Sequence, residues 1–349
     1  MAALAYSASP HFLARATGHV LILAYHRVIP RGERERTFVQ AGMYVTPETF
    51  DRHLRFLTTH FTLLSFEDLL AKWQEGSFDP SGRYCVITFD DGWLDNYVHA
   101  YPLLRAYGAP ATIFLPTEVI GTSRWPWSDR LGVLLQRHGS RLTAGLLREI
   151  LAAMTPSYPV IAAVNGRHPE EIIDSVIEVG KQLPDDARNE LLGRVAEISG
   201  EEGIRSRCFL NWNEVREMSG HGIAFGSHTC THPILTRVST DKLRHELRSS
   251  LEVLQRQRIN DVPVICYPNG DETAAVAAEA RAAGYRAGVT TRAGLESNSP
   301  ADLLRLRRIG IHDDVSRSVP LLMLHVTRQA RSSMRLTPTP HGANEMRPA

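Results

Sequence analysis

The chain has 349 residues, of which 43% are hydrophobic and 22% charged, a composition typical of folded proteins and not of disordered ones. This length allows one large α/β domain, or a domain of about 250 residues that carries an insertion. The formal net charge is +1, so no overall field favours binding to nucleic acid or to an anionic membrane. We therefore expect no nucleic-acid partner.

Cysteine usage and hydropathy indicate the compartment. The four cysteines, Cys85, Cys208, Cys230 and Cys266, lie far apart and form no CxxC pair, which fits a reducing environment. The N-terminal residues lack the continuous apolar run after a basic start that a secretory signal needs. The apolar stretch over 20–25 is too short to span a bilayer. We expect a cytoplasmic protein with no integral membrane segment, which could still associate peripherally with a membrane.

The first third of the chain follows an α/β pattern. Hydrophobic periodicity together with capping and breaking residues predicts each element. The elements are a strand over 19–28, helices over 46–57 and 65–76, a strand over 84–89, a helix over 95–108 and a strand over 111–116. Strand, helix and strand at this spacing predict parallel strands joined by helical crossovers.

The pattern changes from about residue 122 to 205, where the periodicity is helical throughout. The α/β pattern then resumes with helices over 210–222, 239–257 and 272–284, and with strands over 223–228, 262–268, 286–291 and 304–312. Six or seven strands, usually followed by helices, favour a closed or nearly closed β/α barrel, with an open doubly wound sheet as the alternative.

These patterns predict an α/β fold in which a barrel of about seven strands is interrupted by helices. We expect the barrel to occupy residues 19–121 and 206–328, with a helical insertion over 122–205 between its two parts. The last residues, 330–349, are polar and rich in proline, which predicts a disordered tail.

Ionisable residues follow several of the predicted strands. In β/α barrels the functional groups gather at the carboxyl ends of the strands. The strand VITF is followed by Asp90 and Asp91, and the strand IAFGS by His228 and His232, two histidines four positions apart. Further candidates at strand ends are His26, Tyr267, Asn269 and His312.

Two histidines at this spacing can point the same way and chelate one cation. With one carboxylate from Asp90–Asp91 they would form a site that leaves a position open, as catalytic metals require. One aspartate would bind the metal, and its neighbour would act as a base beside the activated water. Each motif alone has a simpler interpretation, because HxxxH pairs are often surface or core histidines and DDG is usually a turn. Both motifs at strand ends of one barrel favour the metal site.

Other candidates remain open. His26 would either line the site or hydrogen-bond the barrel rim, and His312 is as readily a surface histidine as a catalyst. Cys230 lies between the two histidines and should face away from the cation as a small packed residue. Asp95 and Asn96 are interpreted as caps of the following helix.

Four motifs together resemble those of the polysaccharide deacetylases, the NodB-homology domain of carbohydrate esterase family four. The motifs are TFDDG (Thr88–Gly92), SHTCTH (Ser227–His232), YPNG (Tyr267–Gly270) and RIGIH (Arg308–His312). The resemblance covers roughly residues 19–120 and 205–315. The helical insertion departs from the minimal domain of that family and would shape the substrate cleft.

The resemblance implies a distorted (β/α) barrel with one divalent metal, most commonly zinc, with cobalt, nickel or manganese as alternatives. By analogy Asp91, His228 and His232 bind the metal, Asp90 is the general base and His312 the general acid. It also implies that the N–H of Asn269 stabilises the oxyanion. The residues expected to contact the substrate or its oxyanion are Asn269, Tyr267, Ile311 and His26, with Ile309 beside Ile311 in the acetyl-methyl pocket.

One position departs from the family pattern. Many members carry an arginine two residues before the proline of the YPNG motif, oriented towards the base, and this chain has Cys266 there. A branch that acts on exopolysaccharides also lacks this arginine. The resemblance therefore names no partner that holds Asp90.

The leading hypothesis is a metal-dependent hydrolase that removes N-acetyl groups from an amino-sugar-containing polysaccharide, oligosaccharide or glycan precursor. Alternatives are a C–N hydrolase of a non-sugar amide on the same fold, and a non-catalytic glycan-binding relic. An iron oxygenase is disfavoured, because such enzymes usually set a histidine and an acid close in sequence. Exposed tryptophans near the metal, among Trp93, Trp125, Trp127 and Trp212, would favour sugar stacking.

Overall fold

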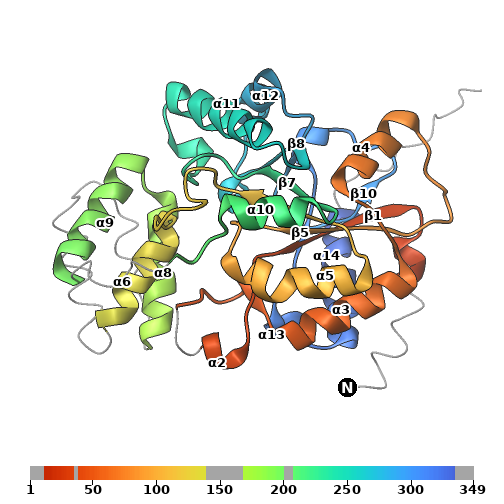
Figure 1. The fold of residues 1–349 in the computed structure, drawn as a ribbon, viewed down its shortest axis with the longest axis horizontal. Coiled ribbons are helices and arrows are strands. Elements are labelled where there is room, and N and C mark those ends of the chain that lie inside the picture. The colour runs from red at the N-terminus through yellow and green to blue at the C-terminus, as the bar shows by residue number, and fades with distance from the viewer. Residues whose placement is uncertain (1–11, 35–37, 139–167, 200–206, 335–349) are drawn as a thin grey trace, which may run out of the picture.

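Seven parallel strands form a curled sheet that helices surround (Figure 1). The computed structural model describes residues 12–34, 38–138, 168–199 and 207–334. The strands are β1 (His19–Tyr25), β5 (Tyr84–Phe89), β6 (Ala111–Leu115), β7 (Ile223–Ser227), β8 (Asp261–Cys266), β9 (Ala287–Val289) and β11 (Ile309–Gly310). Their order is β1-β5-β6-β7-β8-β9, and β11 pairs with the other edge of β1. The expected distorted barrel of about seven strands is confirmed.

The segment before β11 carries the sheet from β9 back towards β1. Leu306 forms a single parallel bridge with Val289 of β9, and Ile309 then pairs with Leu23 of β1. A strand was predicted over 304–312, but only Ile309–Gly310 is regular strand. The physical reason is that this segment changes neighbour within a few residues, so it pairs only briefly with each side of the sheet.

Short strands extend this framework. β10 (Glu296–Ser297) pairs with β1 in the antiparallel sense, and β4 (Thr62–Leu63) pairs with β5. A separate pair is formed by β2 (Arg27–Val28) and β3 (Tyr44–Val45). The helices that cover the sheet are α3 (Pro47–His60), α4 (Phe66–Glu75), α5 (Tyr101–Tyr107), α10 (Trp212–Ser219), α11 (Thr240–Arg256), α12 (Ala274–Ala283) and α14 (Val319–Met334).

The first two covering helices begin where their sequences predict, and α4 also ends there, whereas α3 continues to His60, beyond the predicted end at residue 57. Thr46 accepts a hydrogen bond from the N–H of Thr49 at the start of α3, and Ser65 does the same for Asp68 at the start of α4. Gly76 ends α4 in the left-handed conformation, with φ of 64°, which favours glycine because it has no Cβ.

Asp95 does not cap the helix that follows it. A π-helical turn (Asn96–Ala100) precedes α5, and the Asp95 side chain makes no capping bond to it. Its carboxylate instead accepts hydrogen bonds from Nε of Arg27, at 2.8 Å, and from the N–H of Val28. Because a buried guanidinium and a strand N–H bind this carboxylate, it does not cap the helix.

The described part of residues 122–205 forms helices, seen at the left of Figure 1, which pack around a second hydrophobic core that Ile234 of the barrel also joins. They are α6 (Trp127–His138), α8 (Pro169–Gln182) and α9 (Asp185–Ser199). Gly180 of α8 packs closely on the Trp127 ring of α6, since a Cβ at Gly180 would lie 2.7 Å from that ring. Lys242 of α11 pairs with Asp185 at 2.5 Å, which connects α9 to the barrel.

The C-terminal helix α14 continues through Met334, so residues 330–334 are helical and not part of a tail as predicted. Apolar contacts explain the difference, because Leu322, Met323, Val326 and Ala330 are buried in the main core. The remainder of the predicted tail, residues 335–349, lies outside the described residues.

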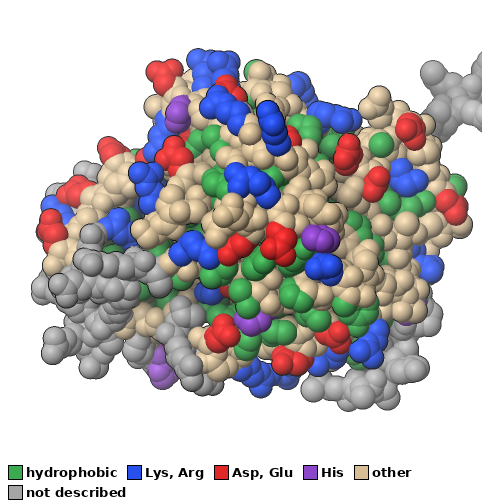
Figure 2. Space-filling model, viewed as in Figure 1, with side chains coloured by type: hydrophobic (Ala, Val, Ile, Leu, Met, Phe, Trp, Pro, Cys, Tyr) green, Lys and Arg blue, Asp and Glu red, His purple; other side chains and the backbone are tan. Residues whose placement is uncertain are grey.

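Charged side chains of both signs are interspersed on the face shown in Figure 2, in keeping with the net charge of +1. Within the ranges that the structure describes, no helix combines the length and apolar character needed to cross a bilayer.

Candidate active site

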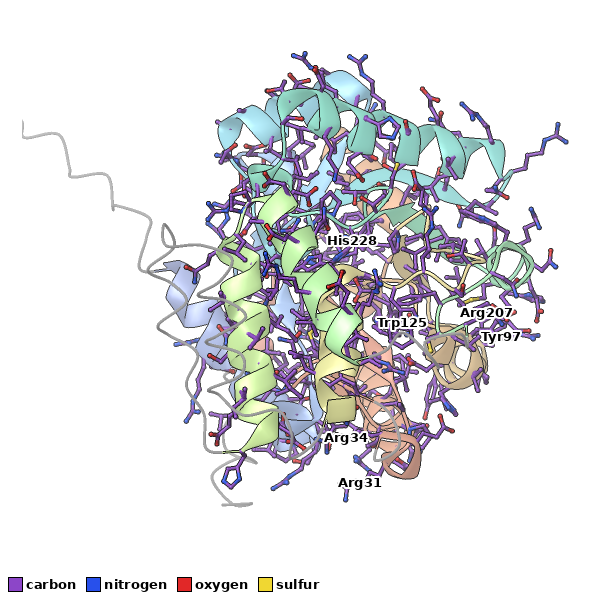
Figure 3. The ribbon with its side chains drawn as sticks, turned by 90° about the vertical axis from the view of Figure 1, so that its left-hand side faces the viewer. Arg31, Arg34, Tyr97, Trp125, Arg207 and His228 are labelled. Atoms are coloured by element: carbon purple, nitrogen blue, oxygen red, sulfur yellow. The ribbon has the colours of Figure 1, made fainter. Side chains whose placement is uncertain are left out.

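A cavity of about 400 Å³ opens at the carboxyl ends of β1, β5, β7 and β8. The barrel contributes its ionisable strand-end residues to one wall, and helices α6 and α8 contribute the facing wall. Figure 3 looks from the side of these helices, and His228 is seen beyond them. The barrel residues on the lining include His26, Asp90, Asp91, His228, His232, Tyr267 and Asn269, and the helices add Trp127, Ser128, Asp129, Glu178 and Lys181.

Three atoms that could bind a metal lie close together, one from the DDG motif and two from the HTCTH motif. Oδ1 of Asp91 lies 3.3 Å from Nε2 of His228 and 3.3 Å from Nε2 of His232. The two Nε2 atoms are 3.1 Å apart. Asp91 and His228 are buried, and burial alone would raise the pKa of Asp91, but its hydrogen bonds with the two histidines hold that pKa well below its usual range.

This spacing fits a cation. A tetrahedral ion with bonds of about 2.0–2.2 Å needs ligand atoms about 3.3–3.6 Å apart, close to the separations observed here. Nδ1 of His228 lies 2.7 Å from the carbonyl of Cys266 and donates to it, which leaves the Nε2 lone pair free for a metal. The indole N–H of Trp93 donates to the second oxygen of Asp91 at 3.1 Å and so orients the carboxylate.

A buried glutamate holds the histidine loop in shape. Glu246 of α11 accepts hydrogen bonds from the N–H groups of Cys230 and Thr231, at 2.7 and 3.0 Å, and from the Thr231 hydroxyl at 2.5 Å. Sequence reasoning missed this residue. The available signal was an acid three positions after Leu243, on the apolar face of α11, where a charge needs partners.

The backbone is strained where the site residues lie. Within the described ranges five residues other than glycine have positive φ, and four of them lie in the site motifs: Asp91, Thr229, His232 and Asn269. This conformation is disfavoured for residues with a Cβ and persists only where surrounding contacts impose it. The hydrogen bond from the N–H of His232 to the Thr229 hydroxyl, at 3.0 Å, is one such contact.

Arg308 binds Asp90, as the arginine found in many family members at the position of Cys266 would be expected to do. Its guanidinium donates to both oxygens of Asp90, each at 2.7 Å, and to the sulfur of Cys266 at 3.1 Å. Burial alone would raise the pKa of Asp90, but the charge and hydrogen bonds of Arg308 lower it to about 2. Asp90, His228 and Cys266 form another group with ligand-type atoms, yet Arg308 already occupies both oxygens of Asp90.

His26 lies beside this pair. Its Nε2 is 3.7 Å from Oδ2 of Asp90, and the ring lines the cavity. Burial lowers the pKa of His26, although the negative charge of Asp90 partly opposes this. Of the two interpretations given to His26 from the sequence, the structure supports the one in which it lines the site.

The structure does not bring His312 or Ile311 to the cavity, contrary to the sequence expectation. The N–H of Ile311 bonds to the carbonyl of Ala24, and its side chain is buried in the main core together with Ile309. The His312 ring lies against Gly42 and 3.3 Å from the carboxylate of Asp314. The pairing of β11 with β1, continued by the Ile311 bond, places the Ile309 and Ile311 side chains on the core side of the sheet.

The YPNG segment completes the barrel side of the cavity. Asn269 and Tyr267 both line it, as expected, and Asn269 adopts a φ of 60°. Gly270 has a φ of 76°, and a Cβ there would lie 2.1 Å from the hydroxyl oxygen of Thr291. Only glycine therefore fits at this position next to the turn that presents the Asn269 backbone.

The tryptophans give little stacking surface. Trp93 is buried beneath Asp91, and Trp127 lines the cavity but is only 9% exposed. Trp125 packs edge-on against Trp93 and Phe209. The aromatic surface that would favour sugar stacking is thus limited, among the described tryptophans, to the small exposed part of Trp127.

Comparison with known proteins agrees with this arrangement. YxkH of Bacillus subtilis (strain 168), whose name assigns it to the polysaccharide deacetylases, is 24% identical over 279 residues, covering 79% of this chain and 69% of its own.

Two solved structures share the fold. The deacetylase PplD of Streptococcus pyogenes, solved in complex with acetate, has a TM-score of 0.56 and 22% identity, covering 88% of this chain and 98% of its own. IcaB of Ammonifex degensii has a TM-score of 0.54 and 16% identity, covering 90% of this chain and 98% of its own. The family model for polysaccharide deacetylase matches residues 78–288, most of the chain, and this chain therefore belongs to the polysaccharide deacetylase family.

Proposed function

We propose that the protein is a metal-dependent hydrolase that removes the acetyl group from an N-acetylated amino sugar in a polysaccharide, oligosaccharide or glycan precursor. The observation that carries this proposal is the convergence of Asp91, His228 and His232 within 3.3 Å, directly beside the Arg308-bound Asp90. Membership of the polysaccharide deacetylase family supports the choice of an acetylated sugar.

Asp91, His228 and His232 would hold the cation. When bound, a divalent metal activates water and polarises the amide carbonyl. One carboxylate with two imidazoles suits zinc, and cobalt or nickel would also fit these nitrogen and oxygen ligands, with manganese a weaker alternative.

The surrounding residues have separable roles in this proposal. Asp90 remains ionised at neutral pH because of its low pKa, and it accepts a proton from the attacking water. The N–H of Asn269, presented by the YPNG turn, stabilises the developing oxyanion. His26 passes that proton from Asp90 to the departing amine, since its Nε2 lies 3.7 Å from Oδ2 of Asp90 at the cavity, where His312 does not reach.

Metal removal tests the proposal as a whole. Chelation is expected to reduce acetate release from N-acetylglucosamine oligosaccharides on the order of a thousandfold, and added zinc to restore it. Magnesium is the matched control and should not restore activity, because it prefers oxygen ligands. Unchanged acetate release after complete chelation would contradict the proposal.

The same assay separates the alternatives. A protein that binds zinc but releases acetate from no glycan would favour a C–N hydrolase of a non-sugar amide. A protein that binds no metal under any loading condition would favour the glycan-binding relic. A cytoplasmic location, which we retain as a proposal, would direct attention to lipid-linked or nucleotide-linked sugar precursors.

A pair of histidine variants tests the proton donor. His26→Ala is expected to lower kcat for acetate release about 100-fold, within the usual range for loss of a general acid. His312→Ala is the matched control, and we expect less than about a threefold change because its ring lies outside the cavity. The reverse ranking of the two variants would return the role of general acid to His312.

A further inference from the structure

The helical wall of the cavity carries a carboxylate that the proposed reaction does not use. Asp129 lies in the first turn of α6 and lines the cavity opposite the barrel residues. Among the described residues its side chain accepts one hydrogen bond, from the neighbouring Ser128 hydroxyl at 3.1 Å. An ionised carboxylate has about four acceptor positions, so the described residues leave most of the acceptor capacity of this cavity-lining side chain unused.

The other acids that line this cavity already have partners. Arg308 binds both oxygens of Asp90, and Asp91 lies between the two histidines. Glu178, also on the helical wall, pairs with Lys181 at 2.7 Å. Asp129 differs from them, because the described residues give its carboxylate no ion pair.

The surroundings of Asp129 make this lack of a partner significant. Burial, together with the nearby negative charge of Asp91, raises the pKa of Asp129 to about 6. A partly desolvated carboxylate is unfavourable unless donors satisfy it. A ligand that enters the cavity with hydroxyl or N–H groups would supply those donors.

We infer that Asp129 is a specificity-determining residue that accepts hydrogen bonds from the ring hydroxyls of the acetylated sugar and orients that sugar against the barrel wall. The inference rests on the proposed function and names the group that recognises its substrate. A carboxylate is suited to this task, because hydrogen bonds to a charged acceptor are stronger than neutral ones and a site built for hydroxyls rejects ligands that lack them.

The helices thus act as more than a packing unit in this view. The barrel residues carry out the chemistry on the acetyl group, and the wall formed by α6 and α8 binds and recognises the sugar that bears it. The cavity volume of about 400 Å³ lies at the lower end of the range for small-molecule sites, which suits one or two sugar rings between the walls.

The experiment compares two substrates in the zinc-loaded protein, an N-acetylglucosamine oligosaccharide and the aryl ester 4-nitrophenyl acetate, which has no sugar hydroxyls. For Asp129→Ala we expect kcat/KM for the oligosaccharide, divided by kcat/KM for the ester, to fall about 10- to 100-fold. Most of the change should be a rise in KM for the oligosaccharide. Asp129→Asn keeps one acceptor oxygen and should recover part of the loss.

Glu190→Ala is the control, since Glu190 is an exposed acid on α9 that pairs with Arg194 outside the cavity. Its substrate ratio should equal that of the wild type. Bound zinc and ester hydrolysis report whether each variant is folded. If the wild type releases acetate from the oligosaccharide and Asp129→Ala keeps the wild-type ratio, the inference is overturned. If the wild type cleaves no oligosaccharide, the proposed function itself fails.

Discussion

Asp91→Asn is expected to abolish stable zinc binding and to lower acetate release by about a thousandfold or more. The amide keeps the shape of the side chain but removes the negative charge that lies 3.3 Å from both histidine Nε2 atoms. Two neutral imidazoles then remain, and this set is too weak to hold the cation against water. Zinc content after gel filtration and acetate release are the two measurements.

The neighbouring aspartate provides the matched comparison. Asp90→Asn should also lose on the order of a thousandfold in acetate release, yet it should retain zinc, because Asp90 is bound by Arg308 and not by the histidine pair. Retention of zinc by Asp91→Asn, or loss of zinc from a folded Asp90→Asn, would show that the two roles are assigned the wrong way round.

Arg308→Met is expected to reduce both stability and activity. Arg308 and Asp90 are both buried, and removing one partner of a buried ion pair costs about 3–5 kcal/mol of unfolding free energy, since the other charge remains unpaired. Arg307→Met, at the adjacent and less buried position, is the control and should change stability by less than about 1 kcal/mol. Urea unfolding measures both effects.

The same variant should change the pH profile of acetate release. Arg308 holds the pKa of Asp90 at about 2, and without it burial raises that pKa. Protonated Asp90 cannot accept a proton, so the acid limb of the profile should move to higher pH. A double variant tests the coupling between the two residues. Arg308→Met/Asp90→Asn should lose less unfolding free energy than the two single variants lose together, because no unpaired charge remains. Strict additivity would contradict the coupling.

Local sequence was sufficient for much of the fold. The starts of α3 at Thr46 and α4 at Ser65 and the end of α4 at Gly76 were predicted, because each depends on contacts within four residues. The parallel strands were also predicted, since their apolar runs and the helices between them repeat along the chain. The strand expected over 304–312 was too long, because pairing there depends on two distant neighbours.

The residues of the candidate site divide in the same way, into those that the sequence predicts and those that only the structure reveals. The sequence by itself determined that Asp91, His228 and His232 would follow two parallel strands, and strands that share an edge bring such residues together. Only the tertiary structure decided that Arg308, 218 positions from Asp90, replaces the missing arginine, that His26 and not His312 reaches the cavity, and that Asp129 faces it from α6. These facts depend on which way a side chain points after the sheet has curled and the helices have packed, and no local pattern of residues encodes that direction.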